Sequence, residues 1–160
     1  MLRYLADATF LTYACLVDVN ILRRHQFCSI TLCIKEAQDN LKDPILVRQL
    51  EELVEIIGTG RRIEQGNKNL SETDKRLLAT AVENRNDTLL VTDDLPFAFE
   101  ARARKVDTLS TPFLITLLAQ KKEEGKGSAM KFLNKLMNYY NRERKVLAAI
   151  SKLDEKEEFE

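Results

Sequence analysis

Residues 70–94, LSETDKRLLATAVENRNDTLLVTDD, combine a helix pattern with a strand pattern. After Ser71, apolar residues recur at the spacing of one helix face, namely Leu77, Leu78, Ala81 and Val82. Residues 88–92 then form a short, nearly continuous apolar run, which is typical of a strand covered on both faces. A helix followed by a buried strand is half of an α/β crossover unit. The stretch therefore predicts a parallel sheet layered with helices.

The remainder of the chain continues this alternation. Strands are expected at residues 2–6, 27–32, 61–64, 88–92 and 106–109. Helical patterns lie between them, and one of these has an apolar stripe from Ile45 to Ile57 and is expected to stop at Gly58 and Gly60. We therefore predict an α/β fold: a three-layer α/β/α arrangement with a central parallel sheet of about five strands and right-handed crossovers.

Two glycines, Gly125 and Gly127, are expected to lie in a linker. We predict one domain at residues 1–120 and a helical C-terminal extension at residues 121–160. One long helix is expected there, with an apolar stripe of Met130, Leu133, Met137, Tyr140, Leu147 and Ile150. Residues 126–152 are also strongly basic. The stripe is expected to pack on its own domain, with a homodimer contact or an RNA-facing basic side as the alternatives.

The composition is that of an ordinary globular protein. The chain has 160 residues, 44% of them hydrophobic, and a net charge of +0. It has no apolar run of the roughly 18 residues that a membrane helix needs, and its start lacks a secretory signal pattern, so we expect a cytoplasmic protein with no membrane contact. The three cysteines, Cys15, Cys28 and Cys33, form no CxxC pair, and His25 is the single histidine. Buried, reduced thiols are therefore expected, rather than a disulfide framework or a zinc site.

Acidic residues stand at the ends of the predicted elements. They are Asp7 after the first strand, Glu36 on the helix after the second, Asp74 in the first turn of a helix, and Asp93 and Asp94 after the fourth strand. Each falls at the carboxyl edge of the predicted sheet, where ligands bind in open parallel sheets. Taken singly, each acid is explained as a helix cap or a solvated side chain, as Asp74 is by the near capping box that it forms with Ser71.

Taken together, the same acids predict a metal site. Converging carboxylates repel one another and are costly to hold together unless a cation neutralises them. Oxygen ligands favour a hard divalent ion, so Mg²⁺ or Mn²⁺ is the expected cofactor. Such ions lower the pKa of a bound water and brace the attacking and leaving oxygens of a phosphodiester. The acids therefore predict metal-assisted hydrolysis with water as the nucleophile.

With these motifs, residues 3–118 resemble the PIN domain family of metal-dependent ribonucleases. The resemblance is carried by Asp7 with Thr9, Glu36 after the second strand, the helix start SETD with LLATA, the run LLVTDD and the strand VDTLST. It implies that Asp7, Glu36, Asp74 and Asp94 are the catalytic acids and hold the metal, with Asp93 as a neighbouring ligand or substitute and Thr9 and Thr92 as supporting hydroxyls. The family's T-x-D pattern favours Asp94 over Asp93.

By this resemblance the chain is expected to be an endoribonuclease that hydrolyses RNA with Mg²⁺ or Mn²⁺. The alternative is a non-catalytic PIN-like module that binds RNA or a protein partner within an RNA-processing assembly. Among enzymes, the toxin of a toxin–antitoxin pair, with an antitoxin as partner, competes with a processing nuclease. The basic helical segment after Gly125 is unlike the compact toxins.

Other classes of hydrolase fit the pattern less well. A haloacid-dehalogenase-like opening would read D-x-D, whereas position 9 is Thr. A receiver domain needs its acid pair after the first strand, and here the pair follows the fourth. The chain has no glycine-rich GK[ST] loop, and with His25 alone it has no plausible Ser-His-Asp triad.

Overall fold

The computed structural model describes residues 2–58 and 70–157. The chain forms two compact units, Met1–Leu109 and Ser110–Glu160. None of the helices in the described part of the chain has the length and apolar character that a membrane crossing requires.

The first unit is built on a five-stranded sheet in which every neighbouring pair is parallel. Its strands are β1 (Arg3–Ala6), β2 (Phe27–Ser29), β3 (Glu55–Ile56), β4 (Thr88–Val91) and β5 (Thr108–Leu109). They lie in the order β3-β2-β1-β4-β5. The α/β class and the parallel sheet of five strands predicted from the sequence are confirmed.

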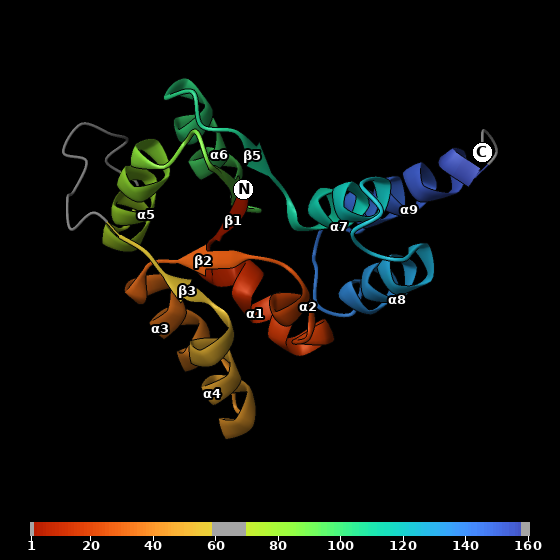
Figure 1. Cartoon of the computed structure of the whole chain (residues 1–160), viewed down its shortest axis with the longest axis horizontal. Helices are drawn as coiled ribbons and strands as arrows, with labels where there is room; N and C mark the ends of the chain where they lie inside the picture. Colours follow the sequence, from red (N-terminus) through yellow and green to blue (C-terminus); the bar gives the residue numbers. More distant parts are fainter. Residues whose placement is uncertain (1, 59–69, 158–160) are drawn as a thin grey trace. The chain divides into compact units, whose positions relative to one another are not determined.

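Helices cover both faces of this sheet (Figure 1). One face carries α1 (Ala8–Asp18), α2 (Ile21–Arg24), α3 (Thr31–Asn40) and α4 (Pro44–Leu53). The other carries α5 (Glu72–Glu83) and α6 (Leu95–Ala103). The short α2 has no counterpart in the sequence prediction. The arrangement is compatible with three α/β/α layers.

Side chains of consecutive strand residues pack on opposite faces of the sheet. On the face of α1, the Phe27 ring lies 5.4 Å from the Tyr4 ring and 5.1 Å from the Phe10 ring, centroid to centroid. The other face has a separate apolar core. Its buried members include Leu5, Cys28 and Leu90 from the strands, Leu77 and Leu78 from α5, and Phe97 and Ala101 from α6. Strands β1, β2 and β4 are therefore covered on both faces, as their apolar runs predict, whereas β3 is exposed.

The helix expected at residues 45–57 is shorter than its apolar pattern indicated. It ends at Leu53, and the chain enters β3 at Glu55. Ile45, expected in the core stripe, is 67% exposed. The prediction was wrong because β3 is defined by hydrogen-bonded pairing with β2, a non-local interaction that helical periodicity does not report. The strand expected at residues 61–64 and the loop that follows it lie outside the described residues.

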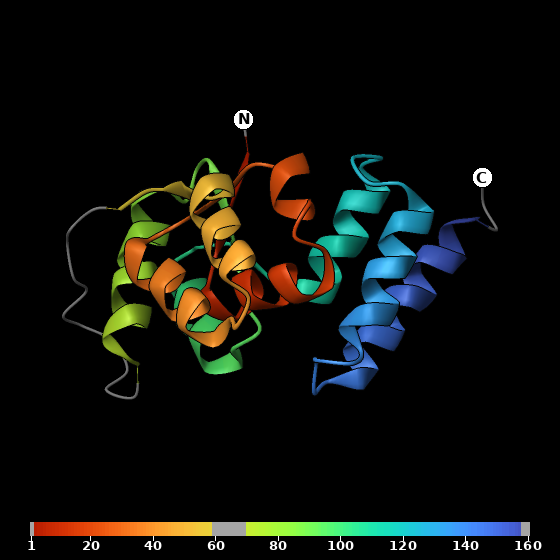
Figure 2. The ribbon, with the colours of Figure 1, turned by 90° about the horizontal axis from the view of Figure 1, so that it is seen from below.

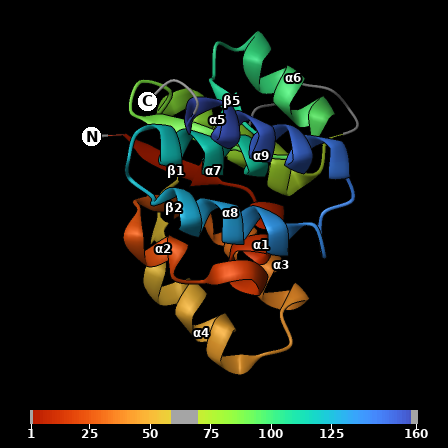
Figure 3. The same cartoon turned by 90° about the vertical axis from the view of Figure 1, so that its right-hand side faces the viewer.

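The second unit contains α7 (Thr111–Gln120), α8 (Lys126–Leu136) and α9 (Glu143–Glu157), which pack against one another (Figures 2 and 3). The single long helix expected after the glycines is therefore wrong, because residues 137–142 turn the chain between α8 and α9. The two compact units divide between Leu109 and Ser110, before α7, whereas the sequence analysis placed the domain boundary between residues 120 and 121. Helix α7 packs with α8 and α9, which periodicity alone does not reveal.

The apolar face of this unit differs in part from the expected stripe. Leu133 and Tyr140 are buried as expected, but Leu147 is 50% exposed. Phe132 and Leu136, which were not assigned to the stripe, are buried instead. The turn between α8 and α9 changes the phase of the helical pattern, so a stripe extrapolated through it selects the wrong residues on α9.

Two leucine truncations test this packing. Leu136→Ala should destabilise the protein by roughly 2 to 5 kcal/mol, because it removes fully buried methyl groups and leaves a cavity. Leu147→Ala is the matched control, and it should change stability by less than about 1 kcal/mol, because half of that side chain is already in water. Urea denaturation followed by circular dichroism measures both. Equal losses for the two variants would contradict the assignment of the buried face.

Candidate metal centre

The order of the strands creates a switch point between β1 and β4. From β1 the chain adds β2 and β3 on one side, and it then returns to place β4 on the other side of β1. In open α/β sheets, ligands bind in the crevice at the carboxyl ends of the strands where the order reverses. Asp7 directly follows β1, and Asp93 and Asp94 follow β4 after Thr92. Acids from both strands thus meet at the switch point.

Asp7 is the most buried acid at this edge, with an exposed fraction of 8%. Its Oδ1 accepts a hydrogen bond of 2.8 Å from the backbone N–H of Phe10 and so caps α1. The pKa of Asp7 is raised from its ordinary 3.8 to about 7, chiefly by burial and also by the nearby charges of Asp93 and Asp74, while hydrogen bonds from Phe10 and Thr92 oppose the rise. Asp7 is therefore held in place while its charged form is disfavoured.

Asp74 lies in the first turn of α5 and is half-buried. Its backbone N–H donates to Ser71 Oγ over 3.1 Å, so the predicted cap at Ser71 is confirmed. Burial raises the pKa of the Asp74 carboxyl, and the charges of Asp94 and Glu36 add to the effect, while hydrogen bonds with Ser71 oppose it. The charge of Asp74 also raises the pKa of Asp7. Asp74 therefore interacts electrostatically with three other acids, namely Asp7, Glu36 and Asp94.

Glu36 is exposed on α3, and a hydrogen bond links its side chain to α5. Its Oε1 accepts a 2.6 Å hydrogen bond from the Thr73 hydroxyl on α5. Thr73 was not assigned a role from the sequence, although it stands inside the SETD motif. The contact joins residues 37 positions apart in the chain. Sequence patterns do not report a hydrogen bond between residues so far apart in the chain.

Asp93 and Asp94 occupy different positions at the end of β4. Asp94 is exposed and caps α6, with its Oδ1 accepting a 3.2 Å hydrogen bond from the Phe97 N–H. Its own N–H donates to the Thr92 hydroxyl over 3.2 Å. The Asp93 side chain is half-buried, and its charge acts on Asp7. Both acids therefore interact electrostatically with the others: Asp93 acts on Asp7, and Asp94 acts on Asp74.

We call this set the acid cluster, and it consists of Asp7, Glu36, Asp74, Asp93 and Asp94. Its donors are carboxylate oxygens, which suit Mg²⁺ or Mn²⁺. Among the residues described, no three side chains of His, Cys, Asp or Glu stand close enough to hold a metal ion. The acids therefore interact electrostatically without enclosing a coordination sphere in this conformation. Glu36 and Asp94 are the exposed members of the acid cluster, and each accepts a hydrogen bond, from Thr73 and from Phe97 respectively.

The hydroxyls expected to support the acids differ in their placement. Thr92 is buried and bonds to both Asp94 and Asp7. Thr9 is exposed on the outer side of α1. Ser29, which the sequence did not single out, is fully buried at the end of β2 and donates a 2.6 Å hydrogen bond to the Ala6 carbonyl beside Asp7. It links the ends of β1 and β2 next to the acid cluster.

The cysteines are free and buried, as predicted. Burial raises the pKa of Cys15 to about 11 and that of Cys28 to about 12. Burial also raises the pKa of Cys33, and the nearby carboxylates of Asp7, Glu36 and Asp74 raise it further. The raised pKa values keep these thiols protonated at neutral pH, which disfavours a role as nucleophiles.

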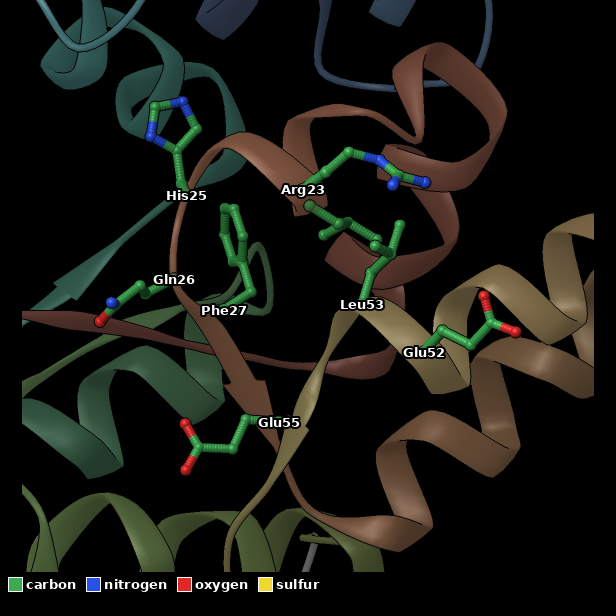
Figure 4. A pocket seen from close by; sticks show the side chains of 8 residues that line it. Arg23, His25, Gln26, Phe27, Glu52, Leu53 and Glu55 are labelled. Carbon is green, nitrogen blue, oxygen red and sulfur yellow. The ribbon is translucent and has the colours of Figure 1, made fainter.

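A pocket of about 330 Å³ lies at the opposite edge of the sheet, near the start of β2 and β3. In Figure 4, Phe27 and Leu53 point toward its middle, while the carboxylates of Glu52 and Glu55 point to opposite sides. The carboxylates around this pocket point away from one another, whereas those of the acid cluster are close enough to interact electrostatically. The acid cluster is therefore the better candidate for chemistry.

Comparison of the chain with protein-family models, with curated proteins and with solved structures finds no match.

Proposed function

We propose that this chain is a metal-dependent endoribonuclease of the PIN type, which hydrolyses RNA phosphodiester bonds with Mg²⁺ or Mn²⁺. The observation that carries the proposal is the meeting of the acid cluster at the switch point between β1 and β4. Sheets of this kind bind ligands at that position. A purely structural role for the acids would not require them to gather where their charges oppose one another.

The electrostatics of the acid cluster favour a bound cation. The pKa values of Asp7 and Asp74 are raised chiefly by burial and also by neighbouring carboxylates, and a bound cation would favour the charged form of both groups. A divalent ion at this edge would supply the positive charge and lower the pKa of a water for attack on phosphorus. The carboxylates of Asp7, Asp74 and Asp94 are the ligands proposed for it, with Glu36 and Asp93 beside them.

The chain's own residues position this ligand set. The hydrogen bonds that Phe10 and Thr92 donate to Asp7 hold its carboxylate in place. The same holds for Asp94, whose Oδ1 caps α6. Thr73 holds Glu36 beside Asp74. Completing a coordination sphere requires the exposed members to rotate inward, so binding is expected to couple to local rearrangement.

Two substitutions in the first turn of α5 test the metal site. Asp74→Asn should weaken Mn²⁺ binding at least about 10- to 100-fold, because even residues behind the ligands have effects of that size. Glu72→Gln is the matched control: it removes a carboxylate from the same turn, but one that pairs with Arg76 outside the acid cluster. Isothermal titration calorimetry measures the affinity. Equal affinity for the two variants would exclude Asp74 as a ligand.

A non-catalytic RNA- or protein-binding module is the second candidate. It is favoured by the lack, among the described residues, of three acids already close enough to hold a metal ion. The same calorimetry separates the candidates, because a module of this kind needs no metal. If the wild-type chain binds no Mn²⁺ at millimolar concentration and cleaves no unstructured RNA, the enzyme proposal is wrong.

The basic face of α8 is proposed to strengthen RNA binding without reading sequence. Lys131 and Lys135 are exposed one helical turn apart. Replacing both with Gln should weaken binding of single-stranded RNA and lower the slope of log K against log salt by about 1.4, since each phosphate contact contributes about 0.7. The control replaces the exposed Lys121 and Lys122 with Gln. Equal slopes for the two double variants would leave α8 with a purely architectural role.

A further inference from the structure

Helix α6 presents an exposed stripe that its packing does not explain. Leu95, Phe99 and Arg102 are spaced by four and three residues and so share one face. Phe99 is 65% exposed and Leu95 is 42% exposed. The helix is already anchored by its other face, where Phe97, Ala98 and Ala101 are buried. The Phe99 ring therefore lies mostly in water and contributes little to the packing of this helix.

Two exposed basic side chains, Arg102 and Lys105, lie at the C-terminal end of α6. Arg102 is exposed, and its Nε donates a 2.8 Å hydrogen bond to the Thr108 hydroxyl, which fixes the guanidinium beside the helix. Lys105 is exposed just beyond the end of α6. The acid on this helix, Glu100, is paired with Arg104 at 2.8 Å. The face therefore suits a polyanion that also carries flat apolar groups.

The helix also starts at the candidate site. Asp94 is the N-cap of α6, and Phe99 lies about 7 to 8 Å farther along the helix axis, at 1.5 Å per residue. A strand lying along the exposed stripe would lead directly to the carboxyl ends of β1 and β4. Single-stranded nucleic acids are bound in this manner by other proteins, with bases stacked on aromatic rings and phosphates beside cations.

We infer that the exposed face of α6 is a binding subsite for single-stranded nucleic acid, in which a base stacks on Phe99 and a phosphate lies beside Arg102 or Lys105. The inference rests on the proposed function for the identity of the polyanion, and it adds the surface that guides the strand to the acid cluster. The stacking contact requires no metal, so it is measurable in chelator.

The chain has no tryptophan, so a single substitution creates a specific optical reporter. In Phe99→Trp, titration with short unstructured oligouridine in the presence of chelator should quench the tryptophan fluorescence, because stacking brings a base against the indole. Ile45→Trp is the matched control, since Ile45 is 67% exposed on α4, on the other face of the sheet. Quenching in Phe99→Trp alone supports the inference, and equal or absent quenching in both variants overturns it.

A second pair of measurements separates base stacking from an apolar contact with a protein. Phe99→Leu keeps an apolar side chain but removes the ring, and it should weaken oligouridine binding about 5- to 150-fold, the range for loss of one stacked base. Phe99→Trp should bind at least as tightly as wild type. Unchanged binding in Phe99→Leu would assign this face to a protein partner and overturn the inference. Metal-dependent cleavage by the wild type tests the proposed function separately, so the two failures are distinguishable.

Discussion

Asp7→Asn should reduce Mn²⁺-dependent RNA cleavage by at least about 100-fold while the protein remains folded. Asn has nearly the volume of Asp and is an equally good N-cap, so its carbonyl oxygen can still accept the hydrogen bond from Phe10. The substitution removes one ligand charge from the acid cluster. Substituting a residue that only supports a metal ligand reduces metal affinity or activity by about 10- to 100-fold. Loss of the ligand itself should therefore reduce cleavage by at least about 100-fold.

Asp43→Asn is the matched control for this experiment. Asp43 caps α4 through a 2.9 Å hydrogen bond from the Ile45 N–H, as Asp7 caps α1, but it does not belong to the acid cluster. Its cleavage rate should equal that of the wild type. Rates are measured with an unstructured RNA in Mn²⁺ and in chelator. A cleavage rate for Asp7→Asn within a factor of two or so of wild type would exclude Asp7 from the reaction.

The same substitution should stabilise the metal-free protein at pH 8, by up to about 4 kcal/mol. Burial raises the pKa of Asp7 from 3.8 to about 7, and each unit of pKa corresponds to about 1.36 kcal/mol. At pH 8 the folded protein must hold a buried, charged carboxylate close to Asp74 and Asp93. An amide at this position carries no charge and avoids that cost.

The effect depends on pH in a defined direction. Below about pH 4, Asp7 is protonated in both the folded and the unfolded protein, so it costs no stability relative to Asn. Between about pH 4 and pH 7 the unfolded chain loses this proton first, which progressively favours unfolding. Above about pH 7 both states are charged, and the full cost remains. The advantage of Asp7→Asn should therefore be about 1.6 kcal/mol at pH 5 and about 4 kcal/mol at pH 8.

Urea denaturation in chelator at these two pH values measures the difference. Mn²⁺ should reverse the ranking, because a ligand that binds only the folded state stabilises it by about 2.7 kcal/mol at a concentration 100 times its dissociation constant. Wild type should gain this stability and Asp7→Asn should gain much less. If the stability difference between the two proteins is the same at pH 5 and pH 8, Asp7 is not a buried acid with a raised pKa.

Much of the candidate site was predictable because each acid lies at the end of a local element. The apolar runs before Asp7 and Asp93 identify strands, and Ser71 identifies the start of a helix. In a parallel sheet all such ends meet at one edge. The structure agrees with the sequence on these points because strand burial, caps and helical phase are properties of short segments.

Predictions failed where distant residues decide the structure. Periodicity assigned Ile45 to a buried stripe and continued the helix into β3, but pairing with β2 determines where that strand lies. The stripe that included Leu147 was wrong because the turn before α9 resets the helical phase. A pattern extrapolated across a break carries no information about the packing on its other side.

The sequence by itself determined the α/β class, the parallel sheet and the acids at the ends of its elements, because these follow from residue order within short windows. Only the tertiary structure decided that β4 lies beside β1, which places Asp93 next to Asp7. It also decided that Thr73 holds Glu36 and that the Phe99 ring lies in water. Strand order, cross-element hydrogen bonds and exposure all depend on which distant segments pack together, and local periodicity does not specify that choice.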